Sequence, residues 1–307
     1  MKTNINKNNL NQKFLKAFTM LEISMVFLIV AILIAGIYQG LDMYYEMRLN
    51  VARSITAKSP INATPDLTLW LETTSKNSFL EKTLINNQKI SQWNDINPQK
   101  IAKLNFTQTT VANRPKYVER SINNLPALRF DNQQMLTINN LKISELVKSN
   151  QATIFLVQNS FSGDITTSAF GWNYSENNIN YRLLTHTGNG AITFDFGTCC
   201  PASSRLSTST ISKFLDRATI ISYRKKISKN DIFVNLKETT ASSSVSTDSI
   251  PSELTGTFAI GKYPPDNAYW FYGLIGEFVV FNRALTDNEK LKIEEYLAEK
   301  WAIKLTY

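Results

Sequence analysis

The carboxylate of Glu22 stands at the start of an uncharged stretch that runs from Ile23 to Leu41. At ~1.5 Å rise per residue, a helix over this stretch crosses most of a ~30 Å hydrocarbon core. A charged carboxylate costs ~2.5–3.5 kcal/mol in that environment, so Glu22 requires a partner or a purpose. The residues before it carry four lysines and no acid, which predicts a cytoplasmic N-terminus. These lysines are Lys2, Lys7, Lys13 and Lys16.

The segment from Ala17 to Glu22 reads Ala-Phe-Thr-Met-Leu-Glu and resembles the prepilin peptidase site of type IV pilins and type II secretion pseudopilins. The resemblance implies cleavage between Ala17 and Phe18, and N-methylation of the new Phe18 amine. It also implies that Glu22 pairs with the Phe18 amine of a neighbouring subunit, so that two charges neutralise each other in the bilayer. Most members have Gly before the cut, and Ala17 departs from that pattern.

Two other interpretations of this N-terminus remain open. A secretory signal peptide has a shorter apolar core and a small-x-small cleavage site, whereas an uncleaved anchor explains the length and the lysines but not Glu22. The pilin resemblance implies a prepilin peptidase, other pilin or pseudopilin subunits and the inner membrane as partners. It places the globular part in the periplasm first, and then on a pilus or the cell surface.

The periodicity predicts a long helix, a short linker and a large β domain. The helix is expected to continue to about Ala57, and Pro60 and Pro65 forbid its continuation. Beyond Pro65, short apolar runs alternate with turn-forming clusters, which is typical of an all-β sandwich or barrel. A helix from Thr286 onward shows a capping box with Glu289, an apolar stripe and an expected outward face. That outward face comprises Lys290, Lys292, Glu295 and Glu299.

Several sequence segments of this region resemble the laminin-G-like members of the concanavalin A-like lectin/glucanase superfamily. They include residues 65–71, 92–95, 113–117 and 125–131, and the strongest is 271–287, which leads into 294–301. The resemblance implies a mainly β fold, in which a long transmembrane helix precedes a jelly-roll sandwich with a C-terminal helix. The expected domains are a leader (1–17), a pilin-type helix (18–58), a linker (59–65) and the sandwich (66–304).

Catalysis is not expected from these residues. A glycoside hydrolase needs two carboxylates that flank one bond, and the Glu-x-Asp-x-x-Glu strand of the related glucanases does not occur here. His186 is the only histidine, and a structural or surface role is expected for it. The sequence therefore predicts a protein that is not an enzyme and has no cofactor.

Sugar binding needs exposed aromatic rings with polar neighbours. The best loop candidates are Trp172, Tyr174, Asp266, Asn267, Tyr269 and Trp270. Packing in the core or at its rim is the competing interpretation. A calcium site is possible from loop Asp and Asn oxygens, but no acidic repeat locates one, so the metal ligands stay unknown.

Cys199 and Cys200 are the only cysteines and are adjacent. In an exported domain they could form a vicinal disulfide, remain as two thiols or bond to another molecule. The net charge of +8 falls to about +4 once residues 1–17 are removed, because they carry four lysines and no acid. No basic stripe is present, so nucleic acid is not an expected partner.

Together these features predict a pilin-like minor subunit of a type IV pilus or related filament, with a lectin-like domain for adhesion or surface recognition. A glycan is the candidate ligand of that domain. A type II secretion pseudopilin and a membrane-anchored lectin-like structural module are the alternatives.

Overall fold

A computed structural model describes residues 19–81, 83–162, 166–188, 191–199, 204–208, 215–238, 247–264 and 269–306. Nine residues singled out from the sequence lie outside these ranges: Lys2, Lys7, Lys13, Lys16, Ala17, Phe18, Cys200, Asp266 and Asn267. The chain forms two compact units, one up to Glu46 and one from Met47 onward.

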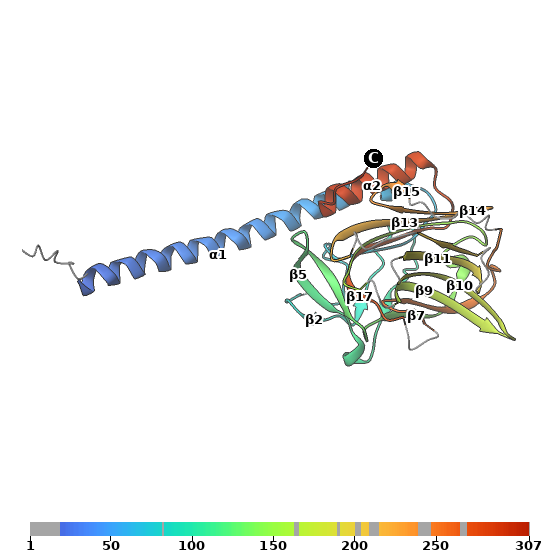
Figure 1. Ribbon diagram of the computed structural model, residues 1–307, viewed down its shortest axis with the longest axis horizontal. Coiled ribbons are helices and arrows are strands. Elements are labelled where there is room, and N and C mark those ends of the chain that lie inside the picture. The colour runs from blue at the N-terminus through green and yellow to red at the C-terminus, as the bar shows by residue number, and fades with distance from the viewer. Residues whose placement is uncertain are drawn as a thin grey trace, which may run out of the picture. The chain divides into compact units, whose positions relative to one another are not determined.

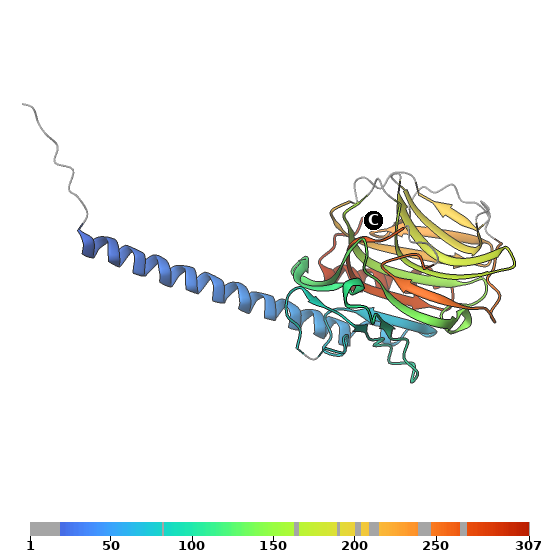
Figure 2. The same cartoon turned by 90° about the horizontal axis from the view of Figure 1, so that it is seen from below.

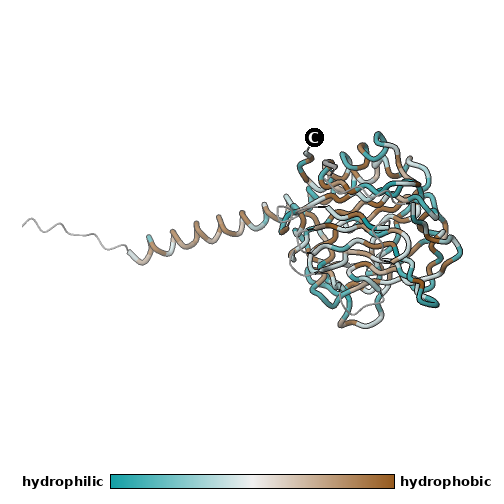
Figure 3. The backbone as a smooth tube through the Cα atoms, turned by 45° about the vertical axis from the view of Figure 1, so that its right-hand side comes forward, coloured by the Kyte–Doolittle hydropathy of each residue, from teal (hydrophilic) through white to brown (hydrophobic). Residues whose placement is uncertain are grey.

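The first unit contains most of helix α1 (Met20–Ala57), which is long and apolar enough to cross a membrane. Every residue from Met20 to Leu41 is exposed, and brown, the hydrophobic colour, predominates along this helix in Figure 3. The helix begins with a capping box. The Thr19 hydroxyl accepts a hydrogen bond from the Glu22 amide (3.2 Å), and the Glu22 carboxylate accepts one from the Thr19 amide (2.8 Å). An N-terminal apolar helix, consistent with a single-pass anchor or a signal, is therefore present as expected.

The second unit is a sandwich of two antiparallel sheets, as the sequence predicted (Figures 1 and 2). One sheet has the order β15-β14-β13-β8-β17-β6-β5-β2, with β1 also beside β17. Its strands are β15 (Lys237–Glu238), β14 (Lys229–Val234), β13 (Ala218–Lys226), β8 (Ala152–Ser160), β17 (Tyr272–Phe281), β6 (Leu125–Asp131), β5 (Lys116–Ile122), β2 (Gln88–Lys89) and β1 (Leu67–Glu72).

The other sheet has the order β12-β11-β10-β9-β16-β7-β4-β3. Its strands are β12 (Arg205–Ser207), β11 (Ala191–Thr198), β10 (Ile179–Gly188), β9 (Thr167–Glu176), β16 (Thr255–Ile260), β7 (Leu136–Lys142), β4 (Phe106–Thr107) and β3 (Gln92–Trp93). The described residues of the unit also form the short 3₁₀ helices η1 (Pro60–Asn62), η2 (Val111–Asn113) and η3 (Ile143–Glu145).

Aromatic rings from both sheets meet in the core. The ring of Phe170 on β9 lies 5.0 Å from that of Phe278 on β17 and 5.6 Å from that of Tyr223 on β13, measured between centroids. Such tilted and edge-to-face pairs add ~0.5–1.5 kcal/mol each beyond the burial of their area. The two central strands β8 and β17 are buried along almost their whole length, as their continuous apolar runs predicted.

Helix α2 (Asp287–Trp301) begins with the predicted capping box between Thr286 and Glu289. The prediction of its outward face is wrong at one position. The side chain of Lys290 is buried, with Nζ 2.7 Å from Glu294 Oε2 and 3.7 Å from the centroid of the Phe233 ring. A cation can lie there because a carboxylate and an aromatic face compensate it.

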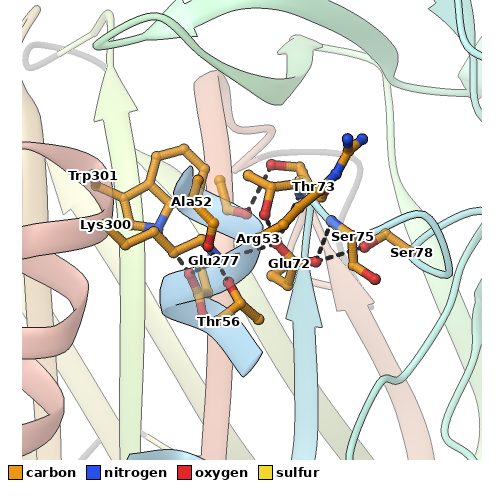
Figure 4. A network of polar contacts seen from close by, with 12 residues as sticks. Ala52, Arg53, Thr56, Glu72, Thr73, Ser75, Ser78, Glu277, Lys300 and Trp301 are labelled. Atoms are coloured by element: carbon orange, nitrogen blue, oxygen red, sulfur yellow. Dashed lines mark hydrogen bonds and ion pairs between the residues drawn. The ribbon is translucent and has the colours of Figure 1, made fainter. Parts of the chain in front are cut away.

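A buried ion cluster joins α2 to the sheet behind it (Figure 4). The ammonium of Lys300 lies 2.9 Å from Glu72 Oε2 on β1 and 2.8 Å from Glu277 Oε2 on β17, and all three side chains are fully buried. Burial favours the neutral amine, but the two carboxylates outweigh it and raise the pKa of Lys300 well above its usual value. Burial by itself would raise the pKa of Glu72. The ammonium of Lys300 outweighs this effect, so the pKa of Glu72 ends below its ordinary value.

Neutral donors satisfy the remaining carboxylate oxygens. Glu277 accepts hydrogen bonds from the indole N–H of Trp70 (2.8 Å) and of Trp301 (2.7 Å), and from the hydroxyl of Tyr296 (2.8 Å). Gly276 permits the approach of Trp301, because a Cβ at this position would overlap the indole ring. The cluster therefore has few unsatisfied groups despite its two acids and single base.

The last turns of α1, which belong to the second unit, are tied to the same region. Arg48 donates to the carbonyl of Lys300 (2.6 Å) and Arg53 donates to the carbonyl of Thr74 (2.8 Å). The Thr56 hydroxyl lies 3.5 Å from that of Tyr296. The C-terminal end of α1 is thus held to the sandwich by charge-assisted hydrogen bonds as well as by packing.

We expect Lys300→Met to lower the free energy of unfolding by about 3–5 kcal/mol, because it leaves two carboxylates buried without their cation. Urea unfolding of the full chain in detergent, followed by tryptophan fluorescence, measures the change. The control is Lys304→Met, which removes the same charge at an exposed position on the segment after α2. Equal stability of the two variants would contradict a dominant role for the cluster.

Candidate functional site

A pocket of about 400 Å³ lies on the outer face of the eight-stranded sheet, and we call it the cationic pocket. Its walls include Ser168, Asn180, Arg182, Leu184, His186, Cys199, Arg205, Tyr263 and Tyr269. Side chains alternate along a strand, so Arg182, Leu184 and His186 of β10 face the pocket while Leu183 of the same strand is part of the core. The sheet thereby places polar groups from three strands side by side.

One buried carboxylate contacts both of the guanidinium groups that line this pocket. Asp195 on β11 is fully buried, and its Oδ1 lies 2.8 Å from Arg205 Nε while its Oδ2 lies 2.6 Å from Arg182 Nη2. Arg205 also donates from Nη2 to Oδ2 (2.9 Å), which makes its contact bidentate. The two arginines and the aspartate together carry one net positive charge.

His186 adds no charge at neutral pH. Burial disfavours its imidazolium form and lowers its pKa to about 4, although Asp195, 4.0 Å away, acts in the opposite direction. Arg205 and Arg182 add to the lowering. The imidazole is therefore a neutral donor or acceptor in the pocket wall at pH 7.

A second pocket of about 570 Å³ adjoins the first, and we call it the aromatic pocket. Its walls include Asn132, Phe161, Thr166, Thr167, Tyr269, Trp270 and Tyr272. Thr166 and Tyr269 line both pockets, so one tyrosine ring stands between a cationic and an aromatic space.

The backbone holds Tyr269 at this position. The Ser168 amide donates to the Tyr269 carbonyl (3.0 Å), and the Tyr263 ring lies 6.3 Å from the Tyr269 ring. Tyr269 has a φ of 56°, a left-handed conformation that is uncommon outside glycine and Asn. Residues in such conformations cluster at ligand clamps and active sites. The next residue, Trp270, has the Lys262 ammonium 4.4 Å from its ring centroid.

Cys199 lies in the wall of the cationic pocket and is disulfide-bonded. Cys200 is the only other cysteine of the sequence, and it lies outside the described residues. The Cys199 amide donates to the Asn180 carbonyl (2.7 Å), which fixes the end of β11 against β10.

A larger pocket of about 610 Å³ lies elsewhere, beside the C-terminal segment. Its walls include Asn123, Asn159, Arg217, Thr219, Asn235 and Lys304, and no aromatic side chain is among its described lining residues. It lacks the rings on which a sugar could stack, so the cationic and aromatic pockets are the better candidates.

The structure separates the aromatic residues that the sequence singled out. Trp172 is fully buried in the core and donates its indole N–H to the Leu141 carbonyl (3.2 Å), so its expected ligand contact is wrong. Tyr174 packs partly against the core and donates its hydroxyl to Glu176 outside both pockets. Tyr269 lines both pockets and Trp270 lines the aromatic pocket, whereas Asp266 and Asn267 lie outside the described residues.

Sequence reasoning missed Arg182, Asp195 and Arg205. The period-two series of Asn180, Arg182 and His186 on one strand was a usable signal, because three polar groups then share one face. Their meeting with Asp195 and Arg205 depends on the order of strands. Within the described ranges, no group of three or more His, Cys, Asp or Glu side chains could hold a metal ion. The calcium site stays a prediction.

No family model matches this sequence. No curated protein matches it either. Among solved structures, domain 4 of an extracellular arabinanase from Geobacillus stearothermophilus, in complex with arabinotriose, is 16% identical, with a TM-score of 0.44 over 75% of this chain and 98% of that one. A Trypanosoma rangeli sialidase is 13% identical, with a TM-score of 0.48 over 79% of this chain. The binding domain of botulinum neurotoxin serotype D is also 13% identical, with a TM-score of 0.46 over 77% of this chain.

The chain spans 34% of the length of that sialidase and 52% of the neurotoxin domain. These likenesses overturn the sequence-based prediction that the chain is not an enzyme, since the similar structures include sialidases and a domain of an arabinanase. The TM-scores below 0.5 assign neither a reaction nor a ligand to this chain.

Protonation of His186 is expected to destabilise the fold in acid. Its pKa is about 4 in the folded chain against about 6.5 when unfolded, so the unfolded state binds the proton more readily. The contribution is complete above pH ~6.5 and is lost as the pH falls towards 4, by up to ~3 kcal/mol. Unfolding of wild type and His186→Gln between pH 7 and 4 measures this, and no other histidine interferes. Parallel stability curves for the two proteins would contradict the expectation.

Proposed function

We propose that this chain is a pilin-like minor subunit, inserted in the inner membrane by α1, that displays a glycan-recognising sandwich on a type IV pilus or related filament. The observation that carries the recognition role is the pair of pockets that meet at Tyr269. A type II secretion pseudopilin and a membrane-anchored lectin-like module are the alternatives, and both keep the same fold.

Support for the pilin role comes from the N-terminal residues. The Ala17–Phe18 junction matches the family's cleavage pattern apart from its Ala, and the apolar helix begins directly after it. Glu22 serves the capping box with Thr19 in the isolated chain. Its carboxylate is exposed in the described unit and would find the Phe18 amine of a neighbour only on assembly.

Support for glycan recognition comes from the chemistry of the two pockets. Sugar rings present apolar faces to aromatic side chains and hydroxyl groups to polar ones, and ligand pockets combine both kinds of surface. The aromatic pocket offers Phe161, Trp270 and Tyr272, and the cationic pocket offers guanidinium, imidazole and amide groups. Two adjoining pockets of about 400 and 570 Å³ suit a ligand of two or more sugar units.

The pilin role predicts a mature chain that begins with N-methylated Phe18, as measured by mass spectrometry of protein made in a host with a prepilin peptidase. Glu22→Gln is expected to be processed normally but to be missing from sheared filaments, because it removes the charge that pairs with the neighbouring amine. A mature chain that still begins with Met1 would indicate an anchored module. Secretion that requires the protein, together with its absence from sheared filaments, would favour the pseudopilin.

Thr19→Ala is the matched control for this experiment. Gln at position 22 can still complete a capping box, so Glu22→Gln removes the charge and keeps the cap. Thr19→Ala removes the cap and keeps the charge. Loss of assembly in Thr19→Ala but not in Glu22→Gln would assign Glu22 to helix capping alone.

The recognition role predicts that Tyr269→Ala weakens binding of the full chain to its glycans on an array by roughly three- to tenfold, the effect of one aromatic contact. Tyr174→Ala is the control, because this ring lies outside both pockets. Absence of any glycan ligand for the wild-type chain would refute the role, and so would equal losses in the two variants.

A further inference from the structure

We propose that the cationic pocket receives the carboxylate of an acidic sugar, and that Arg182 is the residue that binds it. This inference rests on the proposed glycan recognition and names the class of ligand. Three features of the pocket carry it: its charge, the unused donor of Arg182 and its junction with the aromatic pocket.

The charge of the pocket leaves room for one monovalent anion. Asp195 compensates one of the two guanidinium groups, and His186 is neutral at pH 7. The tyrosines and the disulfide-bonded Cys199 add no charge at that pH. Counted over Arg182, Arg205 and Asp195 alone, the site therefore has an excess of one positive charge. A single carboxylate balances it, whereas a dianion would overcompensate it.

Arg182 has a donor that no described residue uses. Its side chain is only 9% exposed, and neither Nε nor Nη2 makes a hydrogen bond of good geometry within the described part of the chain, although Nη2 lies 2.6 Å from Asp195 Oδ2 as an ion pair. A buried guanidinium N–H without a partner is costly, so such groups are seldom left unpaired without a reason. A ligand carboxylate in the pocket would accept this hydrogen bond and supply the missing charge.

The backbone keeps Arg182 in place for this task. Its strand β10 pairs on both sides, with Asn173 of β9 opposite Arg182 on one side and Gly197 of β11 on the other. The contact of Nη2 with Asp195 then limits the rotamers of the side chain. Little conformational entropy remains to be lost when a ligand binds, which favours affinity.

The neighbouring groups select a sugar rather than a simple acid. Asn180 Oδ1 is buried in the pocket wall without a hydrogen-bond partner among the described residues, and it can accept from a sugar hydroxyl. Tyr269 joins this pocket to the aromatic one, so a second sugar unit beside the acidic residue would meet rings. A small carboxylic acid would use only the arginine.

The test is calorimetric titration of the full chain, in a detergent without a sugar headgroup, with a disaccharide of one galacturonic acid and one neutral hexose and with its methyl ester. The two probes differ at one carboxyl group, which is a single negative charge in the acid and an uncharged methyl ester in the other. We expect the acid to bind at least about tenfold more tightly than the ester, the value of one charge-assisted hydrogen bond. Equal affinity for acid and ester would overturn the inference, and so would binding of succinate as tight as that of the acid.

Three variants locate the effect. Arg182→Gln is expected to lower the affinity for the acid about tenfold, to that of the ester. Asn180→Asp is nearly isosteric and leaves the ion pairs intact. Its added negative charge is expected to weaken binding of the acid but not binding of the ester. Arg217→Gln removes an equal charge from the separate pocket beside the C-terminal segment and is expected to change nothing. An equal loss in Arg217→Gln would show that only the net charge of the protein matters, which overturns the inference.

The outcomes also separate this inference from the function on which it rests. If the protein binds neutral glycans on an array but binds the acid and its ester equally well, the carboxylate subsite alone is refuted. A chain that binds neither acidic nor neutral glycans would refute the glycan-recognition role itself. Thermal unfolding of each variant confirms that a lost affinity does not reflect a lost fold.

Discussion

The pairing of the buried Lys300 ammonium with Glu72 and Glu277 is the constraint around which the second unit is organised. Three charges removed from water are tolerable only while each keeps its partners. Their side chains come from β1, β17 and α2, so these elements cannot shift separately without exposing an unpaired charge. The end of α1 is bound to the same group of elements through Arg48 and Arg53. The result is a stiff base at one face of the sandwich.

The two sheets consequently have different tasks. The nine-stranded sheet carries the ion cluster and α2, and it is committed to holding the unit together. The eight-stranded sheet bears the cationic and aromatic pockets on its outer face. A binding surface needs groups held within tenths of an ångström, and a paired strand such as β10 holds Arg182 more firmly than a loop would. Tyr269 lies on the short segment that links the two pockets.

The candidate site was only partly predictable from the sequence. Tyr269 and Trp270 stood out because sugar binding needs exposed aromatic rings with polar neighbours, and both lie in an expected loop. Trp172 was misassigned, since one residue in a strand faces the core or the solvent according to a register that the local sequence does not reveal. Asp195 is an unremarkable acid in an alternating strand until β10 and β12 pair on either side of it.

The sequence by itself determined the local elements: the apolar helix from Met20 to Ala57, the capping box of Thr286 with Glu289, and the short strands between turn signals. Hydrophobic period and capping chemistry are properties of neighbouring residues, so they can be read directly from the chain. Only the tertiary structure decided which distant charges meet. Lys300 and Glu72 are 228 residues apart, and Lys290 is buried although its helical position looked solvent-facing. Whether a polar side chain is buried depends on the partner that strand order brings to it, and strand order is a long-range property of the whole fold.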